Sequence, residues 1–272
     1  MDAVRVIGPG RAGRSVVAAL DAVGGVTVKG LLGRADRLEG AAHGVDLLIV
    51  ATPDDALAGV AAMVEPDPAT VVAHLSGSCG LDVLGSHLHR ASLHPLVGLP
   101  DPERGARRLL GGATFAVSGS DQVARAGVER VVAALGGTPV RVAEEDRAAY
   151  HAAAAIAANH LVALLGQVER VAATSDLPLS LFEGLVRGAV DDAFAAGPAA
   201  ALTGPAARGD LGTLQRHRAV LAGLPTGAAE VAAYDALVAM AQLLAADRTG
   251  GRAGPDGRVG SQPAPPAAGA AA

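Results

Sequence analysis

The chain has 272 residues, half of them hydrophobic, and a formal net charge of -5. This length and apolar content suffice for two modest domains, while the negative charge offers no basic field for nucleic acid or an anionic membrane. The single cysteine, Cys79, excludes an intrachain disulfide and a paired-cysteine metal motif, and the histidines form no H-E-x-x-H motif. We therefore expect a cytoplasmic protein with no metal site and no nucleic-acid or membrane partner.

A glycine motif follows the first predicted strand. Residues 3–7 form a short β-branched run, residues 8–13 read G-P-G-R-A-G, and an apolar stretch at helical spacing follows. In such a motif the first glycine allows a tight turn, the second lets the backbone approach a pyrophosphate, and the third lets the helix pack closely. The phosphates then lie on the free N–H groups of the helix start. The residues expected to bind a dinucleotide here are Gly8, Pro9, Gly10, Arg11, Ala12 and Gly13.

The end of the second predicted strand, residues 26–32, bears on which nucleotide is bound. NAD-preferring enzymes usually place a carboxylate about 20 residues after the glycine motif. Here Arg34 stands directly at that point and Arg37 follows one turn later. Two guanidinium groups suit the 2′-phosphate of NADP, so we expect NADP, with NAD as the less favoured cofactor. Thr52 and Pro53, which follow the third predicted strand, are assigned to the same site.

Five further strand-like runs alternate with helical segments up to residue 143. Continuous apolar runs are typical of parallel strands that are covered on both faces. The alternation predicts an α/β fold, with a Rossmann-type, doubly wound parallel sheet in a domain spanning residues 1–143. The five runs are residues 45–51, 71–75, 91–94, 114–117 and 139–142.

The pattern changes to long Ala- and Leu-rich helical stretches in residues 144–247. The stretch 148–165 has no Asp, Glu, Lys or Arg, but it contains tyrosine, histidine and asparagine and is half alanine. We expect it to be a helix buried in protein rather than a membrane span. Residues 204–210 are expected to form a loop, and residues 248–272, rich in Gly, Pro and Ala, a disordered tail.

Three stretches carry a resemblance: His94-Pro95-Leu96 after the Ser76-Gly77-Ser78 turn, residues 150–159, and Thr203-Gly204-Pro205 with Arg208-Gly209-Asp210. With the Rossmann-then-helical order, the chain resembles the β-hydroxyacid dehydrogenase, ketopantoate reductase and prephenate dehydrogenase group. It is most similar to an uncharacterised bacterial family of candidate oxidoreductases with a C-terminal helical domain of unknown function. The resemblance covers nearly the whole chain before the tail. It implies that residues 144–247 form an all-α domain like that of 6-phosphogluconate dehydrogenase, used for substrate binding and dimerisation.

The resemblance implies a proton donor, but the usual lysine of hydroxyacid dehydrogenases is missing. The only lysine, Lys29, lies in the second predicted strand. His151 is one candidate, because histidine titrates near neutrality, and Asn159, about 12 Å further along the same helix, suits a carbonyl or carboxylate. His94 is the competing donor, since it ends a strand and resembles the His-Pro segment of prephenate dehydrogenases. Structural roles for all three residues stay open.

Three more residues are candidates for binding the substrate. Ser76 and Ser78 follow the fourth predicted strand, and their hydroxyls suit a nicotinamide carboxamide or a substrate oxygen, or alternatively a turn or helix cap. Arg208, in a Gly- and Pro-rich segment, suits a carboxylate, although an Arg–Asp pair or a subunit contact would also explain it. We expect the site to lie in the cleft between the two domains.

The sequence thus predicts an NADP-dependent oxidoreductase that transfers a hydride between nicotinamide and a small oxo or hydroxy acid. A ketopantoate-like substrate follows by analogy with the resemblance. Two other functions stay open: an NADP-binding sensor or regulator without turnover, and an imine reductase of the pyrroline-carboxylate type. The bland alanine-rich helical faces predict a homodimer.

Overall fold

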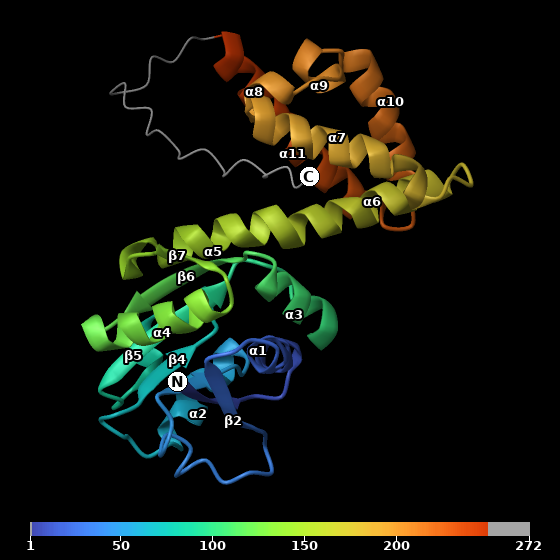
Figure 1. The fold of residues 1–272 in the computed structure, drawn as a ribbon. Helices are drawn as coiled ribbons and strands as arrows, with labels where there is room; N and C mark the ends of the chain where they lie inside the picture. Colours follow the sequence, from blue (N-terminus) through green and yellow to red (C-terminus); the bar gives the residue numbers. More distant parts are fainter. Residues whose placement is uncertain (1, 250–272) are drawn as a thin grey trace, which may run out of the picture. The chain divides into compact units, whose positions relative to one another are not determined.

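The computed structural model describes residues 2–249, and the chain separates into two compact units (Figure 1). Unit 1 is Met1–Val162 and unit 2 is Ala163–Ala272. The division falls inside helix α6 (Leu161–Ala173), later than the expected boundary after residue 143, because the start of the long helix is bonded to the sheet. Helix α11 continues to Thr249, so the expected tail does not begin at residue 248; residues 250–272 lie outside the described residues.

Unit 1 contains a seven-stranded sheet in the order β2-β1-β3-β4-β5-β6-β7. Neighbouring strands are parallel except for β5 and β6, whose antiparallel pairing sets Pro95 opposite Phe115. The Rossmann-type α/β fold is therefore confirmed. The prediction of a wholly parallel sheet is wrong, because the connection from β5 to β6 begins and ends at the same end of these two strands. The strands are β1 (Asp2–Ile7), β2 (Val26–Leu32), β3 (Leu47–Val50), β4 (Val71–His74), β5 (His89–Pro95), β6 (Thr114–Gly119) and β7 (Thr138–Arg141).

Apolar clusters cover both faces of this sheet, because strand residues alternate between the faces. Val4 and Val6 belong to one cluster, which includes residues of α1, α3 and α4, whereas Ile7 belongs to the other, which includes residues of α2 and η1. With both faces covered, the carboxyl ends of the parallel strands are left to carry polar loops. These elements are α1 (Arg11–Asp21), α2 (Asp54–Ala62), η1 (Leu81–Leu84), α3 (Pro102–Leu110) and α4 (Gln122–Ala134).

A long helical stretch follows β7 and runs across the division between the units. The short turn η2 (Glu144–Asp146) leads into α5 (Arg147–Ala155), which continues through the π-helical turn η3 (Ile156–His160) into α6. Single π-helical turns inside α-helices occur frequently at functional sites. This turn carries Asn159, one of the expected site residues.

Unit 2, as far as it is described, is built from helices. One expectation is corrected: within the expected loop 204–210, Pro205–Arg208 forms a helical turn, α9. Proline suits the first position of a helix, and Gly209 ends the turn in the left-handed conformation. The other elements are η4 (Leu179–Phe182), α7 (Glu183–Ala196), α8 (Pro198–Ala201), α10 (Leu211–Ala222) and α11 (Gly227–Thr249).

Two helical segments, Glu144–Ala173 and Gly227–Arg248, are long and apolar enough by length and composition to cross a membrane. Core helices of water-soluble proteins pass the same test. The expected burial of residues 148–165 is not found within the single chain, since none of the most apolar window of the first segment is buried and Val162 is 69% exposed. A helix that is apolar on all sides needs cover on all sides, and the buried residues of this first segment are Arg147, Gln167 and Ala172.

Candidate active site

Glycine occupies the three positions of the motif at the end of β1 for different structural reasons. Gly8 has φ +107°, and a Cβ there would lie 2.7 Å from the Ala51 carbonyl oxygen; a Cβ at Gly13 would overlap the Gly8 carbonyl oxygen. Packing within the protein therefore requires glycine at both positions. At Gly10, φ is -76° and a Cβ would meet nothing within 4 Å. Since no protein contact explains Gly10, the space beside it fits a ligand that approaches the backbone closely, as a pyrophosphate does.

Two unpartnered groups border this space. No side chain caps the start of α1 after Gly10, so the first N–H groups of the helix are available to an anion. Thr52 Oγ1, at the end of β3, is buried and makes no hydrogen bond, which a polar ligand atom would correct. Both features border a pocket of about 890 Å³ at the ends of β1, β2 and β3, so these residues fit a dinucleotide. The expected residues that line it are Gly8, Pro9, Gly10, Arg34, Thr52 and Pro53.

The other three expected cofactor residues, Arg11, Ala12 and Gly13, do not line this pocket. Ala12 packs against the core cluster, Gly13 is buried, and Arg11 is exposed at the first position of α1. What they offer a phosphate is the backbone of the helix start rather than their side chains.

The turn after β2 brings both arginines and two unforeseen carboxylates to the pocket. Arg34 and Arg37 line it as expected, and so do Asp36 and Glu39. Asp36 Oδ2 accepts a hydrogen bond of 2.7 Å from the Gly33 N–H and so closes the turn. The sequence signal was available, because aspartate is a common turn residue and Asp36 follows the end of β2 by four residues.

A second pocket, of about 630 Å³, lies in unit 1 where β5 ends and α5 passes. His94, His151 and Asn159, the three expected catalytic residues, all line it, so the structure brings them together. Tyr150 lines it too and was missed by the sequence analysis. The signal for it was weak, because it is a single aromatic residue in an alanine-rich helix. The rest of the wall is mostly alanine, with Leu96 and Val97.

His94 is the centre of this cluster. Its Nδ1 lies 2.6 Å from the hydroxyl oxygen of Tyr150, and its ring centroid lies 6.1 Å from that of His151, edge to face. Gly77, in the loop after β4, lies against both imidazoles: a Cβ there would be 2.7 Å from His151 Cδ2 and 2.9 Å from His94 Cε1. Glycine at this position therefore allows the loop to approach both rings.

The two bonded groups are uncharged at neutral pH. Burial, with the neighbouring His151 and Arg147, lowers the pKa of His94 from 6.5 to about 4. Burial also raises the pKa of Tyr150 above its ordinary value. A neutral phenol is a donor to a neutral imidazole, which leaves the ring proton of His94 on Nε2. This arrangement can pass a proton from Tyr150 through the imidazole to a ligand.

Ser76 and Ser78 line neither pocket and instead organise the loop after β4. Ser76 Oγ accepts hydrogen bonds from the N–H groups of Ser78 (3.1 Å) and Cys79 (3.0 Å), and Ser78 Oγ donates to Asp54 Oδ2 at 2.6 Å. Burial opposes ionisation of Asp54, but hydrogen bonds from Ser78 and Ser76 hold its pKa below the ordinary value. The serines thus play the turn role that the sequence left open.

Arg208 lies in unit 2, in the last turn of α9, and its role as a carboxylate ligand stays a prediction. The neighbouring Asp210 caps α10, because its Oδ1 accepts from the Thr213 N–H at 3.0 Å.

Comparison with known proteins gives one family match and shows the fold. Residues 113–241 match the family model described as Domain of unknown function (DUF2520), which covers slightly less than half of the chain. No curated protein matches the sequence.

Solved structures share the fold at low sequence identity. A candidate NADP oxidoreductase from Bacteroides fragilis has a TM-score of 0.76 and 19% identity, covering 89% of this chain and 98% of its own. A protein from Thermotoga maritima has a TM-score of 0.67 and 22% identity, covering 90% and 99%. Pyrroline carboxylate reductase from Plasmodium falciparum, solved with NADP bound, has a TM-score of 0.59 and 12% identity, covering 90% and 98%. The shared feature is a Rossmann-like sheet followed by a helical region.

Proposed function

We propose that the protein is an NADP-dependent oxidoreductase that interconverts a small oxo acid and its hydroxy acid, with a ketopantoate-like acid as the first substrate to test. The observation that carries the proposal is Gly10, a glycine at the start of α1 that no protein contact requires. The pocket beside it and the His94 pocket both lie where parallel strands of one sheet end, the edge at which open α/β sheets bind ligands. Fold relatives described as an NADP oxidoreductase and a reductase solved with NADP add support.

Different groups of the chain would hold different parts of the cofactor. The backbone at Gly10 and the start of α1 suit the pyrophosphate. Arg34 and Arg37 suit a 2′-phosphate, and Asp36 is already bonded to the turn, which leaves the arginines as the groups available to that phosphate. NADP is therefore proposed over NAD.

Proton transfer is assigned to His94 with Tyr150 behind it. When bound, NADP(H) supplies or accepts the hydride. The Nε2–H of His94 would donate a proton to the substrate oxygen as the carbonyl carbon is reduced, and the Tyr150 hydroxyl would replace the proton at Nδ1. The Tyr150 phenolate would then take a proton from solvent, which restores the relay. The relay uses a neutral imidazole, in agreement with the pKa of His94 of about 4. His151 and Asn159 then hold the carbonyl or carboxylate of the substrate.

The cofactor assignment is tested by fluorescence titration with NADPH and NADH. We expect NADPH to bind at least about tenfold more tightly, and Arg34→Ala to remove most of that difference. Gly10→Ala should abolish binding without unfolding the protein. Gly59→Ala is the matched control, because Gly59 lies in α2 and a Cβ there also meets nothing within 4 Å. Failure of the wild-type protein to bind either nucleotide would refute the proposal.

The catalytic assignment is tested with a panel of oxo acids and cyclic imines. His94→Gln and Tyr150→Phe should each lower kcat about 100-fold or more while the Kd for NADPH is unchanged. His160→Gln, an exposed histidine on the same helical stretch outside the pocket, should have no effect. If the protein binds NADPH but turns over no member of the panel, the proposal of an enzyme is refuted in favour of a nucleotide-binding sensor.

Imine reduction is the second candidate function. The residues that line the His94 pocket include no Arg, Lys, Asp or Glu, so this part of unit 1 supplies no charged clamp for a carboxylate. An iminium carbon accepts hydride without a strong acid, which suits a site whose central histidine is neutral. Turnover of cyclic imines but not of oxo acids would select this function.

We further propose a cytoplasmic homodimer. Unit 2 exposes large apolar side chains, including Phe194 at 89% and Leu185 at 73%. Helices that are apolar on all sides are covered either by protein or by lipid. A second copy of the chain is the proposed cover, since it offers the same apolar faces.

A further inference from the structure

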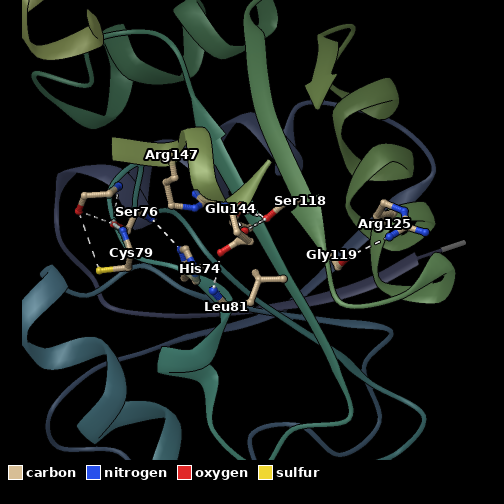
Figure 2. A network of polar contacts seen from close by, with 11 residues as sticks. His74, Ser76, Cys79, Leu81, Ser118, Gly119, Arg125, Glu144 and Arg147 are labelled. Carbon is tan, nitrogen blue, oxygen red and sulfur yellow. Dashed lines mark hydrogen bonds and ion pairs between the residues drawn. The ribbon is translucent and has the colours of Figure 1, made fainter. Parts of the chain in front are cut away.

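Arg147 is a buried cation at the first position of α5, next to the His94 cluster but outside its pocket. It is only 3% exposed, and its Nη2 lies 2.8 Å from Ser92 Oγ, 2.7 Å from Ser118 Oγ and 2.9 Å from Glu144 Oε1. Figure 2 shows Arg147, Glu144 and Ser118 close to one another. Burying a guanidinium is expensive unless it is paired and hydrogen-bonded, so its presence here calls for a specific reason.

Glu144 extends the contact to the loop after β4. Its Oε1 accepts from Ser118 Oγ at 2.9 Å, and its Oε2 accepts from the Leu81 N–H at 3.2 Å (Figure 2). A Cβ on Gly80 would lie 2.9 Å from the same Oε2. Burial opposes ionisation, but hydrogen bonds from Arg147 and Ser118 hold the pKa of Glu144 below its ordinary value, so the pair is charged at neutral pH.

The pair is bonded to β6 through Ser118, and it also joins the three segments that carry the catalytic cluster. The strand β5 carries His94, the helix α5 carries Tyr150 and His151 one turn after Arg147, and the loop after β4 carries Gly77. Each segment reaches the cluster within a few residues of its bond to the pair. Any movement of the start of α5 would therefore change the 2.6 Å contact between Tyr150 and His94.

We propose that the Arg147–Glu144 pair is the positioning element of the active site, which holds Tyr150 and His151 on α5 against His94 on β5. The catalytic part of this inference rests on the proposed function. The geometric part does not.

The charge of Arg147 adds a second effect on the same ring. Burial, His151 and then Arg147 lower the pKa of His94, whereas Asp54 opposes them. The same guanidinium, after burial, lowers the pKa of His74, whose Nε2 is buried without a hydrogen bond. The titratable and charged groups that face His94 are Asp54 of α2, His74 of β4, and Arg147, Tyr150 and His151 of α5.

The test that needs no substrate is a pH titration of the histidine ring signals by NMR on the full chain, with His94 assigned from His94→Gln. Arg147→Met should raise the titration midpoint of His94 by about half a pH unit or more, because a facing positive charge is removed. Arg147→Lys keeps the charge and should leave the midpoint nearly unchanged. Arg141→Met is the control, since Arg141 forms an exposed pair with Glu129 on the same unit. An unchanged midpoint in folded Arg147→Met would overturn the electrostatic effect.

The kinetic test uses the best substrate of the panel. Arg147→Lys and Glu144→Gln should lower kcat about tenfold or more, with the Kd for NADPH unchanged within about twofold, because the glycine-motif pocket does not include the pair. Equal kcat values in both variants and in the wild type would overturn the positioning role. Should no panel member be turned over, the proposed function fails. The position of Tyr150 is then read from the NMR chemical shifts of the His94 ring in Arg147→Lys, rather than from its titration midpoint. Chemical shifts equal to those of the wild type would overturn the inference.

Discussion

The two units bury their apolar residues to very different extents. In unit 1 both faces of the sheet are covered, and residues such as Leu48, Ile49 and Phe115 are at most 1% exposed. In the described part of unit 2 the buried hydrophobic residues are Ala172, Leu214 and Leu221, while Phe194 and Leu185 are exposed to solvent. A sheet with helices on both faces completes its own core, whereas a few alanine-rich helices expose more apolar surface than they can cover. Unit 1 should therefore fold by its own contacts and unit 2 should depend on a partner.

The largest expected effect is at the centre of unit 1. Gly13→Ala places a methyl group on the Gly8 carbonyl oxygen, which is fixed backbone, so the free energy of unfolding should fall by roughly 4 kcal/mol or more. Gly10→Ala is the matched control and should change it by less than about 0.5 kcal/mol. Urea denaturation followed by circular dichroism measures both. Equal stabilities would mean that the packing of α1 on β1 is not as described.

Acidification should also weaken unit 1. The pKa of His74 and that of His94 are about 4 in the folded protein against an ordinary 6.5, chiefly because both rings are buried. Between these pH values the unfolded chain binds more protons, so the free energy of unfolding falls as the pH drops through this window. From pH 6.5 to 5 the loss should be about 2 kcal/mol for each histidine.

This pH dependence is measured by urea denaturation at pH 5 and pH 7. His94→Gln should remove about half of the difference, because one of the two neutral rings is gone. A protein that is equally stable at both pH values would contradict the burial of these histidines.

The exposed apolar side chains of unit 2 provide the next test. Phe194→Glu should weaken the proposed dimer by about 2 kcal/mol per copy, because the side chain would no longer bury its apolar surface. Light scattering gives the mass of the assembly, and the dependence of Tm on protein concentration gives the linkage between dimerisation and stability. Arg187→Ala, on the same helix and bonded to Glu183 at 2.8 Å in an exposed pair, should leave the dimer intact. A monomeric wild-type chain would refute the proposed homodimer. The apolar helices would then have to be covered by something other than a second copy of the chain.

The smallest expected effect concerns a polar contact inside unit 2. Gln167 Nε2 donates to the Glu230 carbonyl oxygen at 2.9 Å and joins α6 to α11. Gln167→Ala should reduce the free energy of unfolding of this unit by about 1 kcal/mol, since one buried hydrogen bond is lost. Hydrogen exchange should show faster opening in α6 and α11, with the sheet amides unchanged. Faster exchange in the sheet as well would mean that the two units unfold as one.

Much of unit 1 could be predicted from local sequence. The seven strands and the glycine motif follow from apolar runs and residue spacing, and His94, His151 and Asn159 do meet in one pocket. These features depend on periodicity and on residue chemistry over a few positions, which a single sequence records. The segment around Pro205 was misjudged because one helical turn leaves almost no periodic signal.

The tertiary structure alone decided which distant residues meet. Tyr150 and His94 are 56 positions apart, and Arg147 reaches Ser92 across 55 positions. It also decided that β6 runs opposite to β5 and that Gly10, unlike Gly13, has no packing reason to be glycine. Local preferences are set by neighbouring atoms along the chain. Pairing across the sheet, by contrast, is set by how whole elements pack, and that information appears only when the chain has folded.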